Sequence, residues 1–450
     1  MKLEVGIFKD PQKIEITNAW EVILEQEKTP HKITEQPDCP IIVCDRIVPD
    51  WLPEFMNNGG ICIVTEANQN LLPFKTNFIG HAFVEYIDLT QMDSERTRIS
   101  CSANIFKGDG LGIINIHENR ITKSGIIQDQ YPVFLYKQFG KGGCYYSGIP
   151  FSKLITGLGD TLRVCPYFSK FTERIVSVDK HNIIRSLRFI LIRAFNQIGL
   201  PYVHVWYYPK KYNSAFTFRI DVDGVFGENL INISNSALKN QIILSFFINK
   251  SMCEKDQNYL FRISDRHEIG NHADIHNLYS DYTSNYQNIN ECKMWLDQLG
   301  IKNGPWFAAP RGMWNHNLHQ ALNDLNYIFT SDFGCAVSGY PFFPYIAGRR
   351  MKTLQIPVHP FSTERGEIWL KESSKVSMGS KCAINSFINI IRSCYRQNYP
   401  IMLYSHPKIL GTMADEVFSN ITIELHNKNI WNTTLAEFAE WWILRDKFNF

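Results

Sequence analysis

The stretch FRIDVDG, residues 218–224, is the part of the chain that decides its fold. The residues before the aspartates, 215–220, are rich in aromatic and β-branched side chains and predict a buried strand. In an extended backbone, residues two apart point to the same face, so Asp221 and Asp223 are expected side by side. Two neighbouring carboxylates repel each other unless a cation or a proton lies between them. The stretch therefore predicts a cation site at the end of a strand.

A second stretch, HADIH at residues 272–276, supplies nitrogen ligands. His272 and His276 are four residues apart, so a helical turn or a tight loop would direct both imidazoles the same way. Two imidazoles and one carboxylate form a set typical of catalytic zinc, with a fourth position left for water and the second carboxylate free to act as general base. Two surface histidines and a turn-forming D-x-D remain the structural alternative. Ala273 stands where the zinc-protease motif H-E-x-x-H has its glutamate, so that class is not indicated.

Five segments in fixed order resemble the five motifs of the polysaccharide deacetylase family of carbohydrate esterases. The segments are residues 220–224, 271–276, 307–314, 330–334 and 403–407. The resemblance runs from about Phe216 to the C-terminus. It implies a distorted (β/α) barrel in which Asp221 is the base. It also implies a divalent metal, with zinc as the first candidate, held by Asp223, His272 and His276.

The resemblance assigns further roles in the same site. His406 is expected to be the general acid that protonates the leaving amine, and Asp332 is expected to tune it. Ala308 stands at the usual arginine position of the third motif, so Arg311, three residues later, is the candidate to hold the base carboxylate. Candidate substrate contacts in this loop are Pro310 and Trp314, with core packing as the alternative for Trp314.

The predicted function is a metal-dependent hydrolase that removes an acetyl or formyl group from the nitrogen of an amino sugar, in a glycan or its intracellular precursor. Two alternatives stay open. One is a hydrolase of a linear or cyclic non-sugar amide on the same fold. The other is a catalytically inert carbohydrate-binding module.

Two α/β domains are predicted. Strands and helices alternate from residue 201 onward, which indicates parallel strands, so residues 201–450 are expected to form the catalytic barrel. Residues 1–200 form a separate α/β domain that weakly resembles the glutamine-amidotransferase-like fold. We expect it to be non-catalytic, because neither Cys62 nor Cys144 lies in a nucleophile elbow.

The composition of the chain limits which partners and which cellular compartment we expect for the protein. The 450 residues carry a formal charge of +2, which argues against a general electrostatic grip on nucleic acid. The 11 cysteines are odd in number and lack paired spacing, which favours reduced thiols. Without a signal-like N-terminus or an apolar run of about 18 residues, we expect a cytoplasmic protein with no transmembrane segment. Peripheral membrane association and the oligomeric state are left open.

Overall fold

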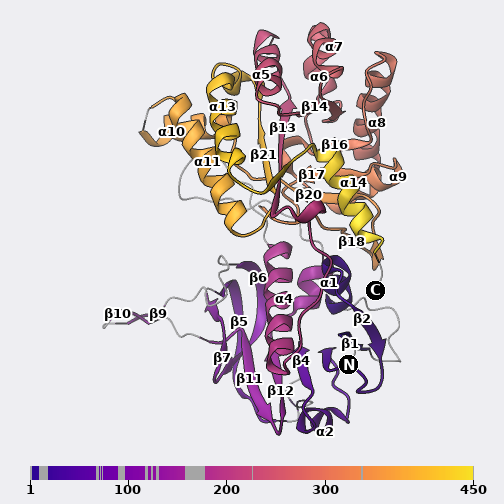
Figure 1. Cartoon of the computed structure of the whole chain (residues 1–450), viewed down its shortest axis with the longest axis vertical. Coiled ribbons are helices and arrows are strands. Elements are labelled where there is room, and N and C mark those ends of the chain that lie inside the picture. Colours follow the sequence, from indigo (N-terminus) through magenta and orange to yellow (C-terminus); the bar gives the residue numbers. More distant parts are fainter. Residues whose placement is uncertain are drawn as a thin grey trace.

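The structure is a computed structural model, and it describes most of the 450-residue chain. The described residues are 3–9, 19–66, 70, 72, 74–89, 97–116, 120–122, 125–127, 131–157, 178–224, 227–335, 338–374 and 376–448. They form two sheet-based bodies stacked along the long axis (Figure 1).

The C-terminal body is built on a parallel sheet with the strand order β20-β17-β16-β15-β14-β13-β21, and β22 also pairs with β13. The strands are β13 (Ser214–Val222), β14 (Ser245–Ile248), β15 (Glu268–Asn271), β16 (Trp306–Ala308), β17 (Phe329–Asp332), β20 (Leu354–Pro357), β21 (Ile401–Ser405) and β22 (Ile430–Asn432). The two ends of the order are joined after β20, where the backbone N–H of His359 donates to the carbonyl of Met402 at 2.9 Å. The sheet is thus an almost closed, distorted barrel, as predicted.

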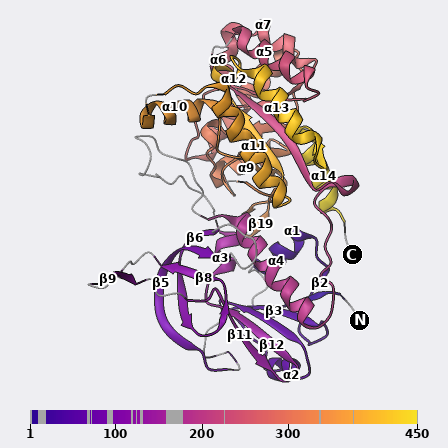
Figure 2. The ribbon, with the colours of Figure 1, turned by 60° about the vertical axis from the view of Figure 1, so that its left-hand side comes forward.

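Helices follow the strands around this barrel (Figures 1 and 2). They are α5 (Gly227–Lys239), α6 (Lys250–Cys253), α7 (Asn258–Ser264), α8 (Tyr282–Gln298), α9 (His316–Asp324), α10 (Thr363–Ser374), α11 (Ser380–Arg396), α12 (Pro407–Leu410), α13 (Ala414–His426) and α14 (Leu435–Asp446). A small antiparallel pair, β18 (Tyr345–Ile346) and β19 (Arg349–Arg350), lies after β17. None of the helices in the described ranges is long and apolar enough to cross a membrane.

The N-terminal body has a mixed sheet in the order β2-β1-β3-β4-β12-β11-β7. Its strands are β1 (Val5–Phe8), β2 (His31–Thr34), β3 (Ile41–Asp45), β4 (Ile61–Thr65), β7 (Gly110–Leu111), β11 (Phe134–Phe139) and β12 (Gly142–Ser147). β11 and β12 form an antiparallel hairpin. One sheet face shares a core with α1 (Ala19–Glu27), α3 (Phe151–Thr156) and α4 (Lys180–Gln197), and the other with α2 (Leu52–Asn57).

A second, antiparallel sheet in this body was not predicted. It has the order β6-β5-β8 and consists of β5 (Asn77–Asp88), β6 (Thr97–Lys107) and β8 (Ile113–Ile116). A short pair, β9 (Arg120–Thr122) and β10 (Gly125–Ile127), follows it. Apolar side chains of the antiparallel sheet belong to the same core as α4, so it adds a layer to the N-terminal body.

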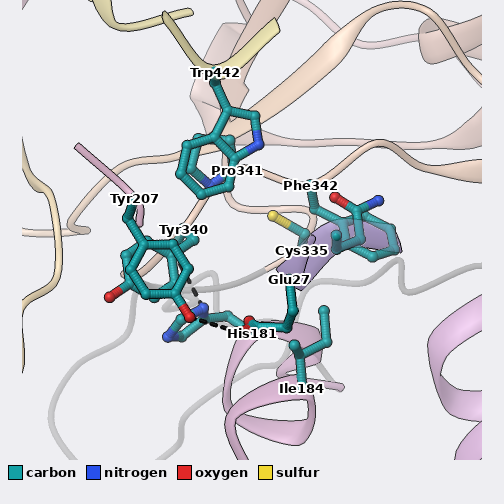
Figure 3. Close-up of a pocket in the computed structure, with 10 residues that line it drawn as sticks. Glu27, His181, Ile184, Tyr207, Cys335, Tyr340, Pro341, Phe342 and Trp442 are labelled. Atoms are coloured by element: carbon teal, nitrogen blue, oxygen red, sulfur yellow. Dashed lines mark hydrogen bonds between the residues drawn. The ribbon is translucent and has the colours of Figure 1, made fainter. Parts of the chain in front are cut away.

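Aromatic rings hold the two bodies together (Figure 3). The rings of Tyr207 and Tyr340 stack with centroids 3.8 Å apart, and Trp442 of α14 lies parallel to both. The Tyr207 hydroxyl donates to Glu27 of α1, and the backbone N–H of Tyr340 donates to Nδ1 of His181 of α4. The stack therefore connects barrel segments with the helices of the N-terminal body.

Arg445 of α14 joins the two bodies by hydrogen bonds. Its buried guanidinium donates to the carbonyls of Gln26 and Glu27 at the end of α1, each at 2.8 Å. It also donates to the carbonyls of Val205 and Trp206 in the segment that enters the barrel. Carbonyls at a helix end lack partners within the helix, so Arg445 satisfies groups that burial would otherwise leave unpaired.

Candidate metal centre

The predicted ligands lie at the carboxyl ends of barrel strands. Asp221 and Asp223 end β13, and His272 directly follows β15. In the part of the chain that the structure describes, one group of potential ligands brings its atoms within 4.8 Å of one another: Asp223, His272 and His276. Parallel strands of a barrel present their carboxyl ends on one face, which is why segments about 50 residues apart converge here.

Neighbouring backbone groups fix the orientation of His272. Its Nδ1 lies 2.8 Å from the carbonyl oxygen of Ala308, which can only accept, so Nδ1 carries the proton. Its Nε2 is buried with no hydrogen-bond partner, and burial lowers the pKa of the ring. Asn249 donates to the carbonyls of His272 and Ala273 and holds the turn. The result is a neutral imidazole whose free lone pair is available to a metal.

His276 reaches the site through a tight loop rather than a helical turn. Ala273 adopts φ = +68°, and its N–H donates to the side chain of Asn271 at 2.7 Å, which stabilises this backbone. Nε2 of His276 lies 3.3 Å from Oδ2 of Asp223. Burial, with the nearby His272, lowers the pKa of His276 to about 3, so the contact is not an ion pair at neutral pH. An imidazole lone pair and a carboxylate that converge in this way suit a shared cation.

Asp221 lies deeper than Asp223 and has a different partner. Its Oδ2 accepts from Nη2 of Arg219 at 2.9 Å, while Oδ1 is buried without a hydrogen-bond partner. Burial opposes ionisation of Asp221, but the charge of Arg219 is the main effect that lowers its pKa. Asp221 is therefore an anion whose Oδ2 is hydrogen-bonded to Arg219 and whose Oδ1 has no hydrogen-bond partner.

The arginine that pairs with Asp221 is Arg219, and not Arg311, which was the expected partner. Arg311 is exposed on the short turn Pro310–Gly312, with φ = +60°. Its charge contributes to the lowered pKa of His276. Arg219 was overlooked although the signal was present, because residues two apart in a strand share a face and Arg219 precedes Asp221 by two.

His406 also approaches Asp223, with Nε2 3.8 Å from Oδ2 of that residue. Glu364, in the first turn of α10, holds it: Oε2 accepts from Nδ1 and from the backbone N–H of His406, each at 3.2 Å. Burial alone would lower the pKa of His406, but the hydrogen bond to Glu364 and the charge of Asp223 raise it to about 9. His406 is thus a cation at neutral pH and can donate a proton.

Asp332, which was expected to tune His406, has other hydrogen-bond partners. Its carboxylate accepts from the hydroxyl of Thr330 at 2.9 Å, the N–H of Gly334 at 2.8 Å and the amide of Gln355 at 2.7 Å. Burial raises its pKa to about 7. Side chains alternate along β17, so Asp332 lies on the same face as Thr330, and it bonds to Gln355 of β20. Asp332 therefore anchors the turn after β17. The anion beside His406 is Glu364.

The loop of the third motif, residues 307–314, is packed against the core and does not present an exposed aromatic surface for a sugar ring. Trp314 is 8% exposed, and its Nε1 donates to Nδ1 of His319 at 3.1 Å. Core packing therefore accounts for Trp314 better than stacking on a substrate. Pro310 is buried at the start of the turn that leads to Arg311. The polar groups that reach solvent at the site are those of Asp223, His276 and His406, whose side chains are each about a fifth exposed.

Comparison with known proteins gives one family match. Residues 225–329 match the family model described as polysaccharide deacetylase. The matched range contains His272 and His276 and stops short of the segments with Asp332 and His406. A search of curated proteins found no match.

Solved structures with similar folds cover about half of the chain. One is described as a polysaccharide deacetylase from Mycobacterium smegmatis, at 14% identity and a TM-score of 0.46, covering 53% of this chain and 93% of that one. Another is an allantoinase, at 14% identity and a TM-score of 0.43, covering 54% and 94%. A third, from Bacillus anthracis, is a CE4 family pseudoenzyme, at 14% identity and a TM-score of 0.36, covering 53% and 73%. These values are too low to support an inference about activity. Residues 225–329 are therefore similar to the polysaccharide deacetylase family model, over less than half of the chain.

Proposed function

We propose that this protein is a metal-dependent deacylase that hydrolyses the N-acyl amide of an amino sugar. The observation that carries the proposal is a pair of buried atoms without hydrogen-bond partners, Nε2 of His272 and Oδ1 of Asp221, in the site completed by Asp223, His276 and His406. Buried polar atoms are nearly always satisfied, so the two unbonded acceptors fit a site in which Nε2 of His272 binds a metal and Oδ1 of Asp221 accepts from a water.

The residues present fit a divalent metal. Asp223, His272 and His276 would hold it, and the neutral state of both histidines suits them as ligands. Zinc is the first candidate, because two imidazoles and one carboxylate match its catalytic sites. When bound, such a metal polarises the amide carbonyl and lowers the pKa of water to about 7.

The protein's own groups then move two protons. Asp221, ionised and buried, accepts a proton at Oδ1 from the attacking water, because Oδ2 is already occupied by Arg219. His406 donates a proton from Nε2 to the nitrogen of the departing amine. Glu364 keeps that ring oriented by accepting from Nδ1, so Nε2 faces Asp223 and the cleft.

We propose an acetyl or formyl group on an amino sugar, in a glycan or its precursor, as the substrate. The family match supports a sugar substrate. The partly exposed Asp223, His276 and His406 give a bulky glycan access from solvent.

We also propose two domains, residues 1–200 and 201–450, with the first non-catalytic. The two main sheets share no strand in the described residues, and the site residues named above all come from the second domain. Cys62 and Cys144, which a glutamine-amidotransferase-like domain would need as a nucleophile, are fully buried. The first domain would act as a scaffold at the junction held by Arg445.

The test uses the purified full chain. We expect about one equivalent of a transition metal per chain and release of acetate or formate from a panel of N-acylated amino sugars. The variant Asp223→Ala should lose both the bound metal and the release of acetate or formate. Turnover of linear or cyclic non-sugar amides alone would replace the proposed substrate class. Absence of metal binding, with no activity after zinc is added, would refute the proposal and favour an inert binding module.

A further inference from the structure

Two carboxylates end β13, and the structure surrounds them differently. Asp223 lies in the ligand group with His272 and His276. Asp221 is buried two residues before Asp223 on the same strand, yet it is paired with Arg219. A carboxylate so close to a cation site would ordinarily be a ligand itself, because anionic oxygen is among the donors that zinc accepts.

Arg219 is held rigidly inside the barrel. Its guanidinium lies 5.8 Å from the ring centre of Phe247 and 5.2 Å from that of Tyr404. Nη1 donates to the carbonyl of Ser331 at 2.8 Å, and Nη2 donates to Asp221 at 2.9 Å. The side chain is 1% exposed, so it has no solvent into which it could swing. A planar guanidinium fixed between two rings presents its N–H groups in one direction.

The charges of the site balance in two separate pairs. Arg219 neutralises Asp221, which leaves Asp223 as the carboxylate whose charge a divalent ion can compensate. A buried carboxylate without a partner is strongly disfavoured, so without Arg219 the bound metal would become a cation partner available to Asp221.

We propose that Arg219 is a positioning residue that keeps Asp221 out of the metal's coordination sphere and so decides which aspartate is the base and which is the ligand. The inference rests on the proposed function. With Oδ2 tied to Arg219, Asp221 can offer Oδ1 to water, and one coordination position stays open. The division of roles between Asp221 and Asp223 thus depends on a third residue of the same strand.

The test uses full-length protein loaded with cobalt(II), whose visible absorption falls in intensity when a ligand is added. Arg219→Met removes the cation and keeps an apolar stem between the rings. We expect a weaker cobalt spectrum, cobalt affinity at least equal to that of the wild type, and a fall in kcat of about 10²-fold with little change in KM. The double variant Arg219→Met with Asp221→Asn should restore the wild-type spectrum, because the added ligand is gone.

Two further variants make the result decisive. Arg350→Met, which also removes a guanidinium–carboxylate pair and a ring contact but lies at the domain junction, should leave the spectrum and kcat unchanged. Asp221→Asn alone should also keep the wild-type spectrum, and this holds even if Arg219→Met does not fold. A changed spectrum in Asp221→Asn, or an unchanged one in folded Arg219→Met, overturns the inference. Failure of the wild type to bind cobalt would instead count against the proposed function.

Discussion

Replacing Glu364 by glutamine tests the proton donor without touching the ligands. Oε2 of Glu364 accepts from the hydroxyl of Thr363 at 2.9 Å, the hydroxyl of Ser405 at 3.0 Å and two N–H groups of His406. Oε1 accepts from the N–H of Ile409 at 2.9 Å. Every neighbour that the carboxylate contacts in this way is a donor, so both of its oxygens are used as acceptors.

Glutamine has one acceptor oxygen and one amide group that only donates. Whichever way it is placed, a donor of Glu364→Gln faces a donor of Ile409 or of His406. One buried hydrogen bond is lost and its donor is left unpaired, which costs about 1–3 kcal/mol of unfolding free energy. The charge that orients His406 is lost as well. Because a positioned general acid contributes about 10²–10⁴-fold to rate, we expect kcat to fall by about 10²-fold.

Three measurements on Glu364→Gln check this reasoning. Metal content should equal that of the wild type, because Glu364 is not a ligand, and KM for the acylated sugar should stay within about threefold. Asp332→Asn is the matched control, since Asp332 is also a buried carboxylate but bonds to Thr330, Gly334 and Gln355. A wild-type kcat in Glu364→Gln, or a larger loss in Asp332→Asn, would refute the assignment of Glu364 as the partner of His406.

Three further outcomes follow from the structure. Asp223→Ala should bind no zinc by calorimetry, whereas Asp221→Asn should bind it with near wild-type affinity and lack turnover; zinc binding by Asp223→Ala would show the ligand set to be wrong. Burial lowers the pKa of His319 to about 4, so the unfolded state takes up a proton first and stability is lost as pH falls from about 6.5 towards 4, by at most about 3 kcal/mol; urea titrations should show a shallower loss in His319→Gln. Arg445→Met leaves the carbonyls of Gln26 and Glu27 unpaired, so the unfolding free energy should fall by about 3 kcal/mol with kcat unchanged.

The ligands could be predicted because their signal is local. A D-x-D at the end of a strand and two histidines four apart are spacings that a short window contains, and parallel strands bring their carboxyl ends together. Asp223, His272 and His276 do converge, through a tight loop that was one of the two alternatives considered. The barrel itself could be predicted for the same reason, since strand and helix alternation is a property of neighbouring residues.

The partners of the acid and the base could not be predicted in the same way. Glu364 and His406 are 42 residues apart, and α10 was not foreseen, so nothing local connects them. Asp332 was chosen by motif order, but the alternation of β17 directs its side chain towards Gln355. These contacts depend on how elements that are distant in the sequence are placed against each other. The periodicity within one element carries no information about that placement.

The proposed base and the proposed acid each need a neighbouring group of opposite charge. In this chain those groups come from positions that the motifs did not indicate. A base that must stay ionised when buried needs a cation beside it, and an acid that must stay protonated needs an anion. Here Arg219 supplies the first from the base's own strand, and Glu364 supplies the second from the first turn of a helix. Ala308 at a motif's arginine position therefore says little about whether the site works. Charge balance around Asp221 and His406, read from contacts, is the better criterion, and it agrees with the proposed hydrolase.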